Sequence, residues 1–162
     1  MILHCAPLLF NVGCTESKDH TFKHYYDGIT PTIARFIERM DEERIRVSAI
    51  LGHTVESTRE WLLRTYHVSG DTLYDCIRKN AAYATIDAPE SVSHRYITED
   101  VPCGLVPLES IGRTAGLAMP CTTLIIDLAS ALLDIDFRAT GRNLEQIDPA
   151  CWQTCLREQI HG

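Results

Sequence analysis

The sequence of 162 residues predicts a single all-α domain, and three observations indicate this fold class. Apolar residues recur at helical spacing over the most regular stretch, residues 31–51. Prolines and glycines stand where helices begin and end, rather than between short alternating segments. No series of alternating apolar and polar residues indicates a sheet. With 45% hydrophobic residues, a chain of this length can bury one sizeable core.

Two segments precede the most regular helix. Residues 2–12 form a short apolar segment that Pro7 breaks and Gly13 closes, and residues 15–28 are polar and aromatic with turn character. The helix that follows should be capped by Thr30, start at Pro31 and stop at Gly52.

Further helical patterns follow along the chain. We expect helices over residues 55–66, 72–80 (capped by Asp71), 108–115 (stopped by Gly116) and 121 to about 133, then a turn into a short helix at 141–147 and an amphipathic helix from Pro149. Residues 81–93 read as a connector. Because residues 121–133 are apolar nearly all round, they predict a buried central helix.

Residues 94–107 stand out chemically. They hold a cation, two carboxylates, a hydroxyl, a phenol and an imidazole, followed by Pro102, Gly104 and Pro107. Such a polar, rigid segment predicts an irregular functional loop. The lone histidine near the start of the chain, His4, is a candidate acid/base group to act with this loop.

Composition excludes several function classes. A formal net charge of −7 without a basic stripe argues against a nucleic-acid partner. No apolar run approaches the roughly 20 residues of a membrane span, and the first residues lack the features of a signal peptide. We therefore expect a cytoplasmic protein whose seven cysteines are mostly buried free thiols.

The candidate catalytic pair is His4 with Asp100. A histidine exchanges protons near neutral pH, and a carboxylate bonded to its far nitrogen fixes the tautomer and stabilises the imidazolium. Arg95 is the candidate substrate-binding residue, since a guanidinium matches a carboxylate bidentately. The alternative for Arg95 is a surface ion pair with Glu99 or Glu90.

The residues do not indicate a metal site or a nucleotide-binding motif. Cys5, Cys14, His20 and His24 are suitable zinc ligands by type, but their spacing matches no standard zinc motif, so we expect no metal. The sequence holds no Walker loop, no GxSxG elbow and no dinucleotide fingerprint.

The sequence resembles the opine (octopine and nopaline) dehydrogenases. The resemblance lies in HRYITEDVP at 94–102 with GLVP at 104–107, IDLA at 126–129, GRNLE at 141–145, ILH at 2–4 with Pro7 and Asn11, and GITP at 28–31. It covers most of residues 2–52 and 94–147, whereas 53–93 match only as helices.

The resemblance implies a fold, a reaction and residue roles. The fold is the helical bundle of the phosphogluconate dehydrogenase C-terminal-domain type, which in this family closes over an NAD(P)-binding Rossmann domain. The reaction joins an amino acid to a 2-oxo acid, often pyruvate, and reduces the imine. By resemblance His4 is the acid/base, Asp100 orients it, and Arg95 binds a substrate carboxylate.

Two departures from the family shape these expectations. The Rossmann domain is missing from residues 1–162, so we expect it to act in cis or in trans, and we expect the isolated helical domain to be inactive with NAD or NADP. Cys103 stands where an aromatic residue, commonly tyrosine, is expected. Two other functions stay open: a ketopantoate reductase-like dehydrogenase, and a non-catalytic helical interaction or dimerisation module.

Overall fold

The computed structural model describes residues 1–17 and 21–146, and every regular element in these ranges is helical. Their only β-type contact is an isolated bridge between Lys23 and Asp87. The expected all-α class is confirmed. The helix expected from Pro149, together with His20, Cys151 and Cys155, lies outside the described residues.

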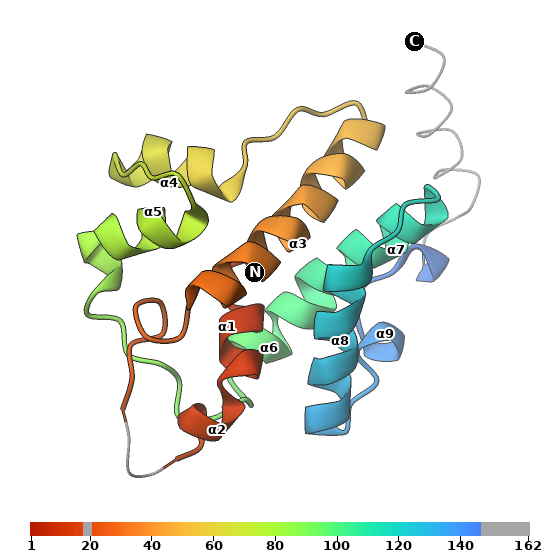
Figure 1. The fold of residues 1–162 in the computed structure, drawn as a ribbon. Helices are drawn as coiled ribbons and strands as arrows, with labels where there is room; N and C mark the ends of the chain where they lie inside the picture. Colours follow the sequence, from red (N-terminus) through yellow and green to blue (C-terminus); the bar gives the residue numbers. More distant parts are fainter. Residues whose placement is uncertain (18–20, 147–162) are drawn as a thin grey trace.

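The longest helix, α3 (Pro31–Ile50), runs through the centre of the fold (Figure 1). The Thr30 hydroxyl accepts a hydrogen bond from the Ile33 amide at 3.3 Å, and Pro31 occupies the first turn, as expected. Gly52 has φ of +74°, the left-handed conformation that ends a helix with least strain.

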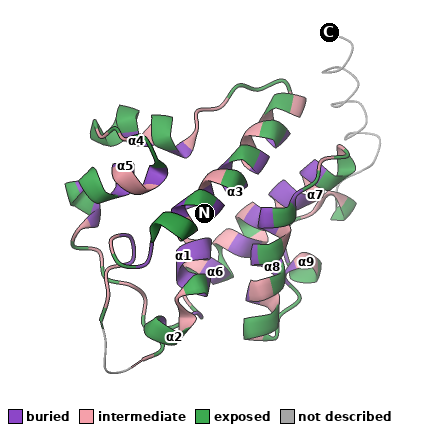
Figure 2. Ribbon diagram, in the orientation of Figure 1, coloured by how far each residue is buried: buried purple, intermediate pink, exposed green. Residues whose placement is uncertain are grey.

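The helices on the two sides of α3 form separate groups. On one side lie α4 (Thr58–Tyr66) and α5 (Leu73–Lys79); on the other lie α7 (Val106–Thr114) and α8 (Pro120–Leu133), with α9 (Phe137–Thr140) beyond them (Figure 1). Helix α3 contacts α1, α5, α7 and α8 directly. The core therefore forms around α3, and its buried faces converge there (Figure 2).

Two expected helix starts move by a few residues. Helix α4 begins at Thr58 rather than at residue 55, because Ser57 and Glu60 form a capping box. Helix α5 is capped by Thr72, not Asp71: Thr72 accepts from the Asp75 amide, and the Asp75 carboxylate accepts from the amide and hydroxyl of Thr72. In both cases the capping box sets the start of the helix.

The apolar segment at the start of the chain forms a helix that Pro7 does not break, contrary to the expectation. Helix α1 (Cys5–Phe10) contains Pro7 in its first turn, where the missing amide hydrogen has no intrahelical acceptor to lose. Residues 5–9 are all buried. A second short helix, α2 (Val12–Thr15), follows. The first side chains of α1 thus lie in the core, next to His4.

The segment at 94–107 is helical, so the expectation of an irregular loop was wrong. It contains α6 (Arg95–Thr98) and a π-helical turn, η2 (Val101–Leu105), which continues directly into α7. Pro102 and Pro107 each stand in a first turn, where proline is tolerated. Ile97, Val101 and Leu105 are fully buried, and this four-residue spacing is what a helical face requires.

Helix α8 is exposed on one side, contrary to the expected buried central helix. Ile125, Ile126 and Ala129 are completely buried, but Leu124 and Leu132 are 48% and 42% exposed. Among the described helices none is both long and apolar enough to cross a bilayer. The remaining short elements are η1 (Ala81–Tyr83), inside the expected connector, and η3 (Leu144–Gln146).

Candidate functional site

His4 and Asp100 meet at the junction of α1 and η2. His4 is the residue that precedes α1, and Asp100 precedes η2. His4 Nδ1 lies 2.7 Å from Asp100 Oδ2, across 96 positions of sequence. Because an ionised carboxylate only accepts, Nδ1 carries the hydrogen and donates it. The Nε2 atom of neutral His4 therefore holds the free lone pair of the ring.

The surroundings favour a neutral imidazole facing an ionised carboxylate. Burial, together with the nearby amino-terminal charge, lowers the pKa of His4 below its ordinary value, against the opposing effect of Asp100. Burial alone would raise the pKa of Asp100, but the hydrogen bond from His4 and the amino-terminal charge outweigh it and lower that pKa. A neutral imidazole bonded to an ionised carboxylate is the arrangement that a general base requires.

Two aromatic rings that the sequence interpretation overlooked hold His4 in place. The Tyr96 ring stacks on the imidazole with centroids 4.0 Å apart and planes inclined by 12°. His24, which is 1% exposed, packs edge-on to His4 and bonds to the Leu3 carbonyl through Nε2. Tyr96 lies within the motif at 94–102, next to Arg95. Its place in that motif was the sequence signal for a role near His4.

Arg95 lies on the outside of α6. Its side chain is 71% exposed and forms an ion pair with Glu99, with Nη2 to Oε2 at 3.2 Å. This is the surface pairing that the sequence had left open as the alternative. Its guanidinium still contributes to the electrostatics of His4. The structure therefore joins His4 to Asp100, and leaves Arg95 nearby but engaged with Glu99.

A cavity of about 380 Å³ opens beside His4. Its polar and charged lining includes His4, Arg44 and Glu56, and three aromatic side chains, Tyr25, Tyr83 and Trp61, form much of the rest.

The sequence analysis also did not identify Arg44 as a cavity residue, although its position in the helical pattern of α3 indicated one. It stands seven residues after Ile37, on the stripe that otherwise carries apolar residues. A charged residue on the buried face of a helix needs a partner or a role.

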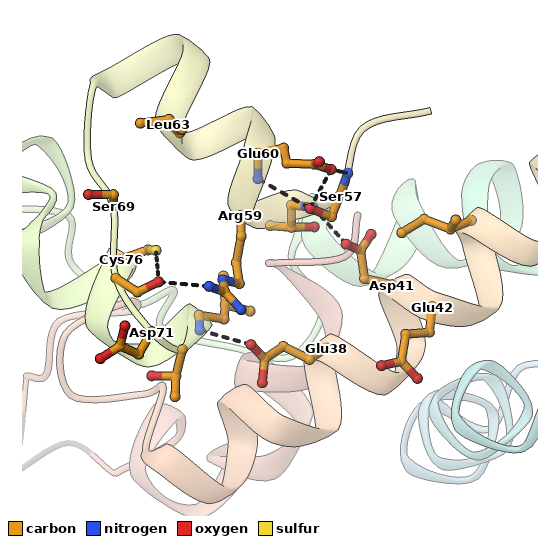
Figure 3. Close-up of a pocket in the computed structure, with 15 residues that line it drawn as sticks. Glu38, Asp41, Glu42, Ser57, Arg59, Glu60, Leu63, Ser69, Asp71 and Cys76 are labelled. Carbon is orange, nitrogen blue, oxygen red and sulfur yellow. Dashed lines mark hydrogen bonds between the residues drawn. The ribbon is translucent and has the colours of Figure 1, made fainter. Parts of the chain in front are cut away.

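A larger cavity, of about 670 Å³, lies between α3, α4 and α5 (Figure 3). Its lining is acidic, with Glu38, Asp41 and Glu42 from α3. Ser57 and Thr58 border both cavities. His4 lines the smaller cavity and not the larger one.

The described candidate zinc ligands, Cys5, Cys14 and His24, do not form a metal-binding group. Within residues 1–17 and 21–146 no three His, Cys, Asp or Glu side chains are grouped to hold a metal ion. The Cys5 thiol is buried and bonds to the Tyr96 carbonyl, whereas Cys14 and Cys103 are exposed free thiols. Cys76 and Cys121 are buried and free.

Comparison with known proteins gives a consistent result. Residues 1–133 match the family model described as NAD/NADP octopine/nopaline dehydrogenase, alpha-helical domain. The chain is 38% identical over 146 residues to an opine dehydrogenase of Arthrobacter sp. (strain 1C), covering 90% of this chain and 40% of that protein. It is 25% identical over 147 residues to protein ocs of Agrobacterium tumefaciens (strain Ach5), covering 91% and 41%.

Solved structures show the same fold. An octopine dehydrogenase solved with NADH and L-arginine superposes with a TM-score of 0.67 at 21% identity, covering 87% of this chain and 42% of that one. Another, solved with NADH and pyruvate, gives 0.61 at 20% identity, covering 87% and 40%. The chain thus spans about two fifths of the length of the relatives it matches.

Proposed function

Because the chain belongs to the octopine/nopaline dehydrogenase family, whose helical-domain model matches residues 1–133, we propose that it supplies the acid/base pair and the substrate-binding surface of an opine dehydrogenase. The reaction condenses an amino acid with a 2-oxo acid such as pyruvate and reduces the imine to a secondary amine, with NADH or NADPH as reductant. The observation that carries the proposal is the 2.7 Å contact between His4 and Asp100 beside a cavity of substrate size.

The pair has a role in each proton transfer. Neutral His4 takes a proton from the substrate ammonium through Nε2, and the free amine attacks the carbonyl carbon of the 2-oxo acid. A second proton moves from the nitrogen of the adduct to the former carbonyl oxygen, which becomes a hydroxyl group. The imidazolium, stabilised by Asp100, then gives its proton to this hydroxyl, which leaves as water and yields the protonated imine. Asp100 stays ionised throughout, because it holds the ring and its charge rather than the proton.

Arg95 is the proposed clamp for the 2-oxo acid carboxylate. Its guanidinium is exposed on α6, five residues before Asp100, and offers a fork of donors that matches a carboxylate. The ion pair with Glu99 costs little to exchange for a substrate carboxylate, since exposed pairs contribute about 1 kcal/mol or less.

The nicotinamide cofactor supplies the hydride when bound. The described residues form helices without a parallel sheet, the scaffold on which a dinucleotide fold holds the pyrophosphate. We therefore assign the dinucleotide to a Rossmann domain, in cis or in trans, and the substrate side of the cleft to residues 1–146. Exposed free thiols at Cys14 and Cys103 fit a reducing, cytoplasmic setting.

A turnover assay tests the proposal. The chain is mixed with NADH or NADPH, pyruvate and a panel of amino acids, alone and together with a nucleotide-binding domain of the family. We expect oxidation of the cofactor, with formation of the secondary amine, only in the combined sample. Robust turnover by the chain alone would refute the division of labour between domains.

Two other results, one from the turnover assay and one from sedimentation, would replace the proposal. Reduction of a 2-oxo acid without any added amine would indicate a ketopantoate reductase-like enzyme. A concentration-dependent homodimer in sedimentation, with no affinity for substrates and no turnover in any combination, would indicate an interaction module.

A further inference from the structure

Arg44 lies on α3 and shares the smaller cavity with His4. Its side chain is 22% exposed, so most of it is sheltered while part of it reaches the cavity. Among the described residues that line this cavity, Arg44 is the one side chain with a permanent positive charge. A half-buried guanidinium needs an anionic partner, which is either a group of the protein or a ligand that enters the cavity.

The protein fixes Arg44 through two hydrogen bonds. Arg44 Nε donates to Asp41 Oδ1 at 2.8 Å, and Arg44 Nη2 donates to the Glu56 carbonyl at 2.6 Å. Asp41 is itself buried and accepts a 2.6 Å hydrogen bond from the Thr58 amide, at the contact of α3 with α4 (Figure 3). The planar group is therefore oriented by α3 and by the segment that precedes α4 before any ligand arrives.

One end of the guanidinium stays available. Arg44 Nη1 forms no hydrogen bond with the described part of the chain, in contrast to Nε and Nη2. Glu56 is the one carboxylate side chain among the described residues that line the cavity, and both of its oxygens accept hydrogen bonds from Arg64, at 2.6 and 2.9 Å. An anion that enters the cavity thus finds a preoriented donor without displacing a protein partner.

The proposed reaction requires a second cation. The secondary amine that it forms carries two carboxylates, one from the 2-oxo acid and one from the amino acid. Arg95 is the proposed partner of the carboxylate from the 2-oxo acid. Resting on the proposed function, we propose that Arg44 binds the carboxylate of the amino-acid half, while His4 Nε2 addresses the nitrogen and Asp41 serves as the positioning residue for Arg44.

A binding experiment on the full chain tests this assignment. The probes are the secondary amine made from leucine and pyruvate, and its counterpart made from isoamylamine and pyruvate, which lacks only the carboxylate in question. Binding is followed by the NMR shift of the Trp61 indole, which lines the cavity. We expect the wild-type chain to bind the dicarboxylate at least tenfold more tightly, and Arg44→Gln to bind both probes equally.

Two further variants separate recognition from structural damage. Arg44→Lys keeps a cation and should retain part of the preference. Arg59→Gln removes a guanidinium that lines the larger cavity and bonds to the Gly70 carbonyl, so it should leave the preference unchanged. All variants are compared at matched helicity by circular dichroism.

The outcomes are distinguishable from those of the turnover assay. Equal binding of the two probes by the wild-type chain, absence of binding to it, or a preference that survives in Arg44→Gln would each overturn the role of Arg44. If the preference depends on Arg44 while no combination of substrates is turned over, the carboxylate site stands and the proposed reaction falls.

Discussion

Glu43 caps Thr122 across 79 residues of sequence: one carboxylate oxygen accepts from the Thr122 amide at 2.8 Å and from its hydroxyl at 2.7 Å. The other oxygen accepts from the Cys121 amide at 2.8 Å. Helix α8 has no side-chain cap at its own N-cap residue, Met119. The negative charge that satisfies its first turn therefore comes from the middle of α3.

Glu43→Ala should destabilise the fold by about 2–4 kcal/mol, because three buried donors lose their acceptor together. Denaturant unfolding followed by circular dichroism measures the change. Glu42→Ala is the matched control, since the neighbouring Glu42 is exposed. Similar midpoints for the two variants would show that the cap contributes little.

Asp100→Asn should lower kcat by roughly a hundredfold or more in the complete enzyme, and His4→Ala by a similar factor or more. The amide cannot stabilise the imidazolium as a carboxylate does, and it admits the wrong tautomer. Steady-state turnover with pyruvate and an amine measures this loss. Glu90→Gln, an exposed change, should leave kcat unaltered; full activity in both His4 and Asp100 variants would remove the site assignment.

Arg95→Ala should raise KM for the 2-oxo acid about tenfold or more while changing folding stability little, because the side chain is 71% exposed. Glu99→Gln is the informative partner variant. It frees the guanidinium and should lower that KM or leave it unchanged. A KM that stays constant in Arg95→Ala would assign the guanidinium to the surface ion pair alone.

Stability should fall as the pH drops from about 6.5 to about 4. Burial lowers the pKa of His24 to about 4, so between these values the unfolded chain binds a proton that the folded chain excludes. The contribution amounts to roughly 3 kcal/mol at its full extent, and the lowered pKa of His4 acts in the same direction.

Unfolding titrations at several pH values measure the slope. His24→Gln should flatten the curve over this interval, and His53→Gln, at an exposed position, should not. Identical slopes in the wild type and His24→Gln would show that His24 is not the titrating group.

The presence and order of most helices could be predicted from local sequence signals. The exact starts of α4 and α5 depended on capping boxes. Thr30, Pro31 and Gly52 delimit α3 because each acts within its own turn. The segment at 94–107 was misjudged because its polar residues and prolines outweighed the four-residue spacing of Ile97, Val101 and Leu105, which the structure shows to be buried.

Only part of the candidate site could be predicted from the sequence. His4 and Asp100 carried a motif, and the prediction that they meet agrees with their contact in the structure. Tyr96, His24 and Arg44 act through packing and through bonds to distant residues, such as the tie from Arg44 to Glu56. Local spacing does not encode such contacts, because they exist only after α1, α3 and α6 have packed together.

The distance of 96 positions between His4 and Asp100 has a consequence for how the protein matures. A chain whose helices have formed, but whose α1 has not yet docked, would give a nearly complete far-ultraviolet signal without the contact between His4 and Asp100. Helicity and this contact should thus emerge at different times after dilution from denaturant, since long-range closure follows local order. Circular dichroism and the NMR shift of the Trp61 indole, recorded together during refolding, would show the interval between them.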